Sequence, residues 1–279
     1  MPVSLDTVQW IHGAADCAAS NDPLLQVHQF DDDTFILRQS KCFSFEGPFM
    51  YLMFGSQRVV LFDAGAGPDD SSNRILPLRA RVDETIDHWR ARHDARSVDL
   101  IVAHTHSHGD HVFWDRQFMS RPNTTIVGHD LPHIKAFFGL PRRPEGQAVL
   151  DLGERELTIL PLPGHERTHI AAYDRRTEVL LTGDTLYPGL LTVQDWPNYV
   201  RSAARLSAFA ATHRVSAVLG NHIEMKRTPR MLFPIGTTFQ PDEHPLPLRV
   251  QHLEEWHTAC QAMSNSPHRD VHADFIIDA

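Results

Sequence analysis

The densest group of chemically capable side chains is the stretch Thr105-His106-Ser107-His108-Gly109-Asp110-His111, which follows the apolar run at residues 100–103. Neutral imidazole nitrogen and carboxylate oxygen are the donors that a borderline cation such as zinc prefers. His106 and His108 are two residues apart and can converge on one ion in an extended turn. Gly109 permits a bend that turns Asp110 and His111 toward a second ion. The stretch therefore predicts a metal site.

Further metal-capable residues stand where other apolar, strand-like runs end in a glycine or a turn. They are His165 after Gly164, Asp184 after Gly183, and His222 two residues after Gly220. In layered α/β proteins, functional side chains gather at one edge of a sheet, where strand ends present them from rigid supports. We therefore expect these separate segments to converge on the histidine-rich stretch.

The elements that must position these residues are predicted from apolar periodicity. Strands are expected at 34–37, 49–54, 58–62, 98–103, 124–127, 157–160, 179–181 and 215–219, beginning with an antiparallel sheet. Helices are expected at 8–19, 71–93, 197–212 and 249–263, whereas residues 224–248, rich in Pro and Gly, are expected to be irregular. No repeat or flexible linker is visible. We therefore expect one domain over residues 1–279, with 224–279 forming a C-terminal irregular segment plus a helix and a polar tail.

Composition limits the function classes. A formal net charge of -9 opposes binding to polyanions such as nucleic acid. The three cysteines, Cys17, Cys42 and Cys260, are far apart and form no CxxC pair, so we expect buried free thiols rather than a disulfide framework.

The N-terminus does not resemble a signal peptide, and no apolar run has membrane-spanning length. We expect a cytoplasmic protein that acts on a small molecule, without nucleic-acid or membrane partners, and leave homodimer formation open.

The motifs resemble those of the metallo-β-lactamase superfamily over about residues 49–222. The Asp-x-Gly turn of that family resembles Asp63-Ala64-Gly65, and its His-x-His-x-Asp-His signature resembles residues 106–111. Its Pro-Gly-His turn, its Gly-Asp turn and its last histidine resemble residues 163–165, residues 183–184 and His222. The resemblance implies an α/β fold of the four-layered αβ/βα sandwich type, with two mixed sheets packed face to face and helices outside.

The resemblance also implies a binuclear metal site. His106, His108 and His165 would hold one ion, Asp110, His111 and His222 the other, and Asp184 would bridge the two. We expect two zinc ions, with iron or manganese as alternatives. A hydroxide that bridges the ions would form near neutral pH, because the cations lower the pKa of water by several units. Asp110 and Tyr187 are the predicted catalytic residues, Tyr187 because lactonases of this family place a tyrosine there against the substrate carbonyl.

The residue at position 184 narrows the expected reaction. β-Lactamases of the superfamily carry Cys or Ser where this chain has Asp184, so the resemblance favours the glyoxalase II and lactonase branches. We therefore expect hydrolysis of an ester, thioester or lactone. No Lys or Arg cluster at residues 188–205 matches the glutathione-carboxylate site of glyoxalase II. Alternatives are a sulfur dioxygenase that holds one iron through His106, His165 and Asp184, a phosphodiesterase of the same fold, and a non-catalytic scaffold.

The remaining acids and histidines near the motifs are expected to support the site. Asp63 would orient a ligand or the backbone of the signature. His169, four residues after His165, is expected to be a structural histidine, with support of His165 from one helical turn away as the alternative. His104 has the chemistry of a ligand but lies outside the signature. We expect the other histidines, such as His129, His133, His213 and His257, to be structural or solvated.

Overall fold

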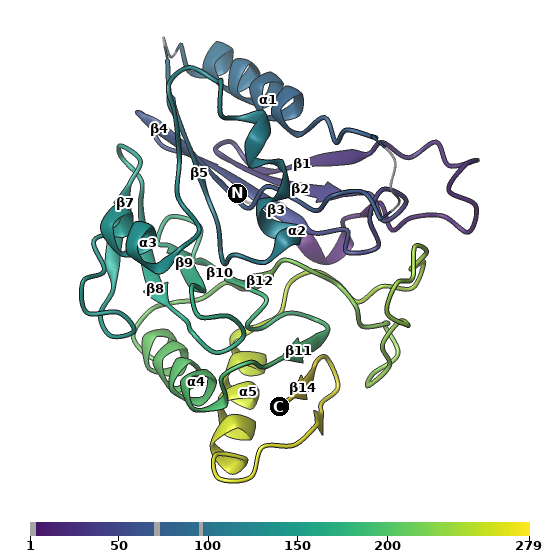
Figure 1. The fold of residues 1–279 in the computed structure, drawn as a ribbon, viewed down its shortest axis with the longest axis vertical. Coiled ribbons are helices and arrows are strands. Elements are labelled where there is room, and N and C mark those ends of the chain that lie inside the picture. The colour runs from purple at the N-terminus through teal and green to yellow at the C-terminus, as the bar shows by residue number, and fades with distance from the viewer. Residues whose placement is uncertain (1–3, 70–72, 95–96) are drawn as a thin grey trace.

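Two β-sheets face each other across the centre of the molecule, and helices cover their outer faces (Figure 1). The computed structural model describes residues 4–69, 73–94 and 97–279. The layers run from α1 (Leu78–His93) through the two sheets to α4 (Trp196–Ala210) and α5 (Val250–Ala262). The predicted four-layered sandwich is therefore confirmed.

The first sheet has six strands in sequence order, and its first part is the predicted antiparallel sheet. Its strands are β1 (Leu25–Asp31), β2 (Thr34–Gln39), β3 (Phe49–Phe54), β4 (Arg58–Phe62), β5 (Asp99–Ala103) and β6 (Thr124–Ile126). The last three strands are parallel. Because parallel neighbours end at the same edge, the residues that follow β4, β5 and β6 lie together.

The second sheet has the order β12-β10-β9-β8-β7. Its strands are β7 (Ala148–Asp151), β8 (Glu156–Pro161), β9 (Ile170–Asp174), β10 (Val179–Gly183) and β12 (Ala217–Gly220). β10 and β12 are parallel, so the segments that carry Asp184 and His222 leave the sheet side by side. Short helices α2 (Gly109–Val112), η2 (Phe113–Gln117) and α3 (Leu131–Phe138) complete the loops, and η1 (Leu5–Thr7) lies near the N-terminus.

Apolar side chains fill three layers of core. One lies between the sheets and includes Ile36, Tyr51 and Leu181. A second joins the outer face of the first sheet to α1, and a third joins the second sheet to α4 and α5, where Trp256 is fully buried. Because both faces of each sheet are covered by core, several strands are continuous apolar runs and do not alternate between apolar and polar residues.

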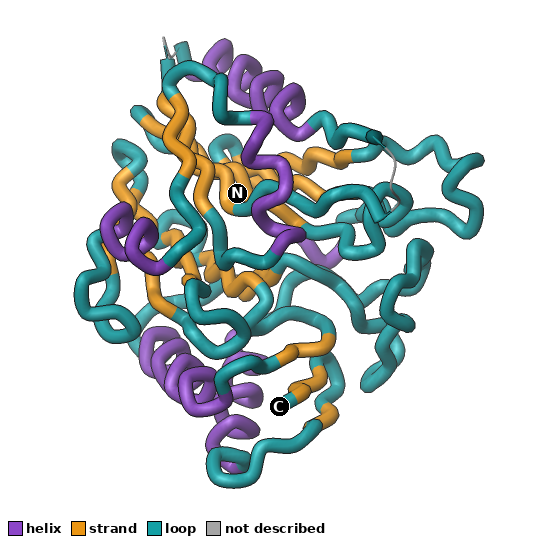
Figure 2. The backbone as a smooth tube through the Cα atoms, in the orientation of Figure 1, coloured by secondary structure: helices purple, strands orange, loops and turns teal. Residues whose placement is uncertain are grey.

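Three predicted elements differ in the structure. Residues 8–19 form no helix, because Gly13 adopts a positive φ of 79° and bridges to Phe239. The helix predicted from residue 71 begins at Leu78, since Pro77 disfavours helical geometry in the residue before it; residues 71–72 lie outside the described part. The tail after α5 ends in β13 (Asp270–Val271) and β14 (Ile276–Asp278), which form a small sheet with β11 (Leu190–Thr192) (Figure 2). Residues 224–248 are irregular, as predicted.

The expectation of free cysteines is wrong for one pair. Cys17 and Cys42 form a disulfide between the N-terminal segment and the loop after β2. The pairing depends on the N-terminal segment folding back on the first sheet, where Ile11 N donates to the Gln26 side chain, and residue spacing carries no sign of that contact. Cys260 is free and buried in α5, as predicted. Among the described residues, no helix has both the length and the apolar character needed to span a membrane.

A buried arginine joins the two sheets, and its removal is expected to destabilise the fold. Arg155 donates to the carbonyl oxygens of Asp33, in the turn between β1 and β2, and of Phe54 in β3, and to the Asp174 carboxylate in the second sheet. We expect Arg155→Met to lower the free energy of unfolding by about 3–5 kcal/mol, because Asp174 loses a buried cationic partner. Arg214→Met removes an ion pair whose arginine side chain is 85% exposed, and we expect less than about 1 kcal/mol from it. Urea unfolding of both variants measures the difference; equal effects would contradict it.

Candidate metal centre

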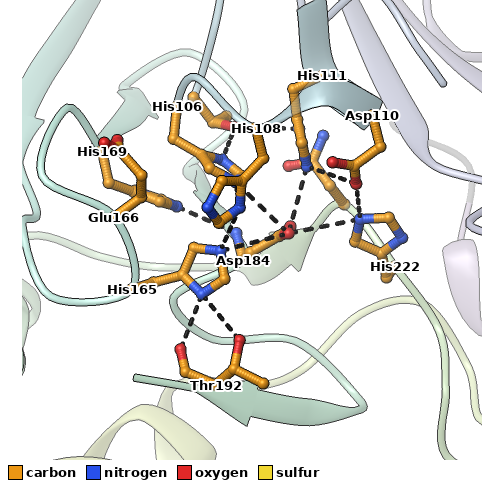
Figure 3. A network of polar contacts seen from close by, with 12 residues as sticks. His106, His108, Asp110, His111, His165, Glu166, His169, Asp184, Thr192 and His222 are labelled. Carbon is orange, nitrogen blue, oxygen red and sulfur yellow. Dashed lines mark hydrogen bonds and ion pairs between the residues drawn. The ribbon is translucent and has the colours of Figure 1, made fainter. Parts of the chain in front are cut away.

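All of the ligands predicted from the sequence lie in one cluster at the edge where the strands of both sheets end (Figure 3). His106, His108, Asp110 and His111 come from the loop after β5 and from α2. His165 comes from the turn between β8 and β9, Asp184 from the end of β10, and His222 from the loop after β12. The cluster divides into a group of His106, His108 and His165 and a group of Asp110, His111, Asp184 and His222.

The first group consists of three imidazoles whose nitrogens face one another. Nδ1 of His108 lies 2.9 Å from Nε2 of His106 and 3.1 Å from Nε2 of His165. The rings of His106 and His165 are nearly perpendicular, with centroids 4.8 Å apart. Three nitrogen donors that converge in this way form one face of a tetrahedral zinc site and leave a further position open.

Asp184 connects the two groups. Its Oδ2 lies 3.2 Å from Nε2 of His111 and 3.5 Å from Nε2 of His222 in the second group. It also lies 3.7 Å from Nε2 of His106 and 3.8 Å from Nε2 of His165 in the first. Asp110 completes the second group, with Oδ2 3.2 Å from the same nitrogens of His111 and His222. One carboxylate therefore faces nitrogens of both groups.

Backbone carbonyls fix the orientation of two of the imidazoles. Nδ1 of His165 donates to Thr192 O at 2.8 Å, and Nδ1 of His222 donates to Glu46 O at 3.1 Å. A proton held on Nδ1 leaves the lone pair on Nε2, which points into the cluster. Because Thr192 ends β11, the small third sheet also positions a ligand.

Asp63 ties together the loops that carry the ligands. Its carboxylate accepts hydrogen bonds from Thr105 N at 2.8 Å and from Asn221 Nδ2 at 2.7 Å, and Nδ1 of His111 lies 3.4 Å away. The residue has a positive φ of 69°, a conformation that Asp adopts more readily than most residues. These contacts agree with the orienting role expected from the sequence.

His169 supports the backbone of Asp184, and its ring also lies edge-on to that of His165 with centroids 5.9 Å apart. Its Nε2 accepts the backbone N–H of Asp184 at 3.1 Å, and its ring stacks on that of His106. Gly183 makes this approach possible, because a Cβ at that position would lie 2.6 Å from Nε2 of His169. Residues 165–169 form a turn and not a helix, so the contact between His165 and His169 does not come from helical spacing.

The charges of the site fit a metal cation. Burial lowers the pKa of His106 and His165, so both are neutral donors. Burial also lowers the pKa of His111 and His222, but the Asp110 and Asp184 carboxylates outweigh it and raise both values well above the usual range. The acids thus draw positive charge onto these two rings, and a divalent cation would supply that charge with the rings as neutral ligands.

A buried oxygen of Asp184 without a hydrogen-bond partner is a second observation that fits a bound metal cation. Oδ1 of Asp184 is buried and has no hydrogen-bond partner among the residues that the structure describes. A buried carboxylate oxygen without a partner is unfavourable by at least about 1–3 kcal/mol, and coordination of a cation would satisfy it. The donor set and this oxygen both fit a site for divalent metal.

Tyr187 lies beside the cluster, with its ring centroid 5.7 Å from that of His222. Its hydroxyl is within hydrogen-bond distance of Leu190 O at 2.8 Å and of Glu224 Oε2 at 3.0 Å. Contact with a substrate carbonyl would require the phenol to exchange one of these partners, so its catalytic role stays a prediction.

Several supporting residues were not identified from the sequence. Asn221 joins Asp63 to Phe49 O, and Gln194 lies 3.1 Å from Nε2 of His108. The sequence feature that could have identified Asn221 as a supporting residue is its position between Gly220 and His222 at a strand end. The roles of the Glu46 and Thr192 carbonyls could not be recognised in the sequence, because every residue type has a backbone carbonyl.

Removal of the Asp63 charge is expected to weaken metal binding without unfolding the protein. Asp63→Asn keeps the shape and tolerates the positive φ, but it weakens the bonds that hold the signature loop. Loss of such an orienting partner lowers metal affinity about 10–100-fold. Competition with a chromophoric chelator measures this, with Asp99→Asn, an exposed acid at the other end of β5, as the control. Equal affinities in Asp63→Asn and wild-type protein would contradict the orienting role.

Known proteins similar to this chain include thioester hydrolases. The acyl-coenzyme A thioesterase MBLAC2 of Gallus gallus is 30% identical over 212 residues, 63% of this chain and 72% of the relative. The protein of that name from Bos taurus is 35% identical over 207 residues, 62% and 72% of the two chains. A hydroxyacylglutathione hydrolase of Methylococcus capsulatus is 30% identical over 135 residues, 46% and 47% of the two chains.

Solved structures and a family profile agree on the fold. The metallo-beta-lactamase from Pontibacter korlensis superposes with a TM-score of 0.53 at 15% identity, covering 85% of this chain and 99% of the other. The DIM-1 metallo-beta-lactamase gives a TM-score of 0.50 at 13% identity, covering 87% and 99%. The profile of the metallo-beta-lactamase superfamily matches residues 45–216, which span more than half of the sequence and most of the ligands. This chain belongs to the metallo-beta-lactamase superfamily.

Proposed function

We propose that this protein is a binuclear, zinc-dependent hydrolase of thioesters, with an acyl-coenzyme A as the preferred class of substrate. The observation that carries the proposal is the position of Asp184, whose Oδ2 faces imidazole nitrogens of both ligand groups. A single ion would leave one of the two groups without a cation.

The names of the relatives support a thioester rather than another ester. The relatives described above are named as an acyl-coenzyme A thioesterase and as a hydroxyacylglutathione hydrolase. The first name specifies a thioester, and an acyl group carried on the thiol of glutathione would be one as well. The first aligns over 72% of its length and the second over 47%, which favours the coenzyme A thioester. A cation bound here would lower the pKa of water, so that hydroxide forms near neutral pH, and would polarise the substrate carbonyl.

The residues of the chain supply position and charge for this reaction. The carbonyls of Thr192 and Glu46 hold His165 and His222 with Nε2 directed inward. Asp63 fixes the loop of His111, and His169 fixes the backbone of Asp184. Donors that are held in place before the reaction need little reorganisation during it. This preorganisation is the main source of electrostatic catalysis.

Replacement of Asp184 tests the bridging role. We expect Asp184→Ala to lower kcat/KM for an acyl-coenzyme A by about 10³-fold or more, because loss of several kcal/mol of transition-state stabilisation corresponds to that factor. Metal content should fall from about two zinc ions per chain, the number implied by two ligand groups. Mass spectrometry of the metal and thiol release from the substrate measure both effects. Full activity in a folded Asp184→Ala protein would remove Asp184 from the mechanism.

A substrate panel separates this proposal from the alternatives. The panel consists of an acyl-coenzyme A, an S-acylglutathione, a lactone, a β-lactam and a chromogenic phosphodiester, each assayed before and after chelation and zinc restoration. We expect the acyl-coenzyme A to have the highest kcat/KM, its turnover to be lost on chelation and regained with zinc. A single iron per chain with oxygen consumption on a persulfide would instead identify a dioxygenase, and preferential turnover of the phosphodiester would identify a phosphodiesterase.

A further inference from the structure

Another cluster of metal-capable side chains lies outside the proposed hydrolytic centre. Nε2 of His104 is 2.9 Å from Oδ1 of Asp115, and Nε2 of His129 is 2.6 Å from Oδ2 of the same carboxylate. The two rings are nearly perpendicular, with centroids 4.8 Å apart. One donor atom from each of the three residues lies within 4.8 Å of the others. Two imidazole nitrogens therefore converge on a single carboxylate from two sides.

The three residues come from segments that the first sheet brings together. His104 directly follows β5, Asp115 lies in η2, and His129 follows β6, the parallel neighbour of β5. His104 and Asp115 also bracket the segment that carries His106, His108, Asp110 and His111. A link between them therefore closes the loop that holds most of the ligands of the hydrolytic centre.

The arrangement of the three donors around the largely buried Asp115 is the main argument for a cation. Its side chain is 13% exposed, and within residues 4–69, 73–94 and 97–279 its ion pairs are those with His104 and His129. A carboxylate with so little exposure to solvent is stabilised by positive charge close by. Each imidazole directs one ring nitrogen at a different oxygen of this carboxylate. A divalent cation between the three side chains would compensate the acid directly.

The donor set selects the class of cation. Two imidazole nitrogens and one carboxylate oxygen are ligands that zinc binds readily, with water in a fourth position. The His129 side chain is 41% exposed, so solvent reaches that side of the cluster. We propose that His104, Asp115 and His129 bind a further zinc ion, which fastens the two ends of the ligand-bearing loop. This site is additional to the proposed hydrolytic function and does not depend on it.

The metal content of matched variants tests the proposal. His129→Gln removes one ligand from a partly exposed position, where the fold should tolerate the change. His133→Gln is the control, because His133 pairs with the single carboxylate of Asp130 at 2.7 Å and its side chain is 68% exposed. Each full-length protein is purified with zinc, passed over a chelating resin that strips loosely held surface ions, and analysed by mass spectrometry. We expect His129→Gln to hold about one zinc ion fewer per chain than wild type, since removal of one of three ligands opens the site, and His133→Gln to match wild type.

The test does not depend on how many ions the hydrolytic centre binds, because the result is the difference in zinc ions per chain between wild type and the variants. Loss of one ion in Asp115→Asn as well as in His129→Gln would support the site. Equal zinc counts in wild type, His129→Gln and His133→Gln would overturn it and leave Asp115 in a network of hydrogen bonds. A count of one in wild type that falls to zero in His129→Gln would support this site while contradicting the binuclear hydrolytic centre.

Discussion

A buried carboxylate, Asp184, and a partly buried one, Asp110, lie among imidazoles, and this is the constraint on which the site depends. Asp184 is 6% exposed, and Asp110 beside it faces the same two histidines. An uncompensated buried carboxylate is unfavourable by several kcal/mol, so the arrangement is stable only with positive charge in its midst. Bound divalent metal would supply that charge, which couples metal binding to the stability of the loops that carry the ligands.

The rest of the fold holds those loops in place. The ligands come from four segments far apart in sequence, and parallel strand pairs in each sheet bring their ends together. Asp63 then links the loop after β5 to the loop after β12 through Thr105 and Asn221. The small sheet of β11, β13 and β14 presents the Thr192 carbonyl to His165. Rigid strands thus set the position of each predicted ligand, and hydrogen bonds from outside the cluster orient several of them.

Most residues of the candidate metal centre could be predicted from the sequence, because metal-donor residue types are chemically distinctive and stand at the ends of apolar runs. The convergence of His106, Asp184 and His222 could be predicted from residue type and position alone. Contacts made by backbone carbonyls could not, because no side chain marks them. The Cys17–Cys42 disulfide was missed for a related reason: it depends on how the N-terminal segment folds back on the sheet. Gly13 likewise made residues 8–19 non-helical through a bridge to Phe239, a long-range contact that outweighed the local pattern.

The similarity to known proteins and the geometry of the cluster answer different questions. Superfamily membership rests on the match over residues 45–216, whereas the proposed use of two ions rests on the position of the Asp184 carboxylate. Anomalous diffraction at the zinc absorption edge from crystals of the purified protein tests that use most directly. We expect two strong peaks flanking Asp184, one beside His106, His108 and His165 and one beside Asp110, His111 and His222. A single peak there, or none, would contradict it.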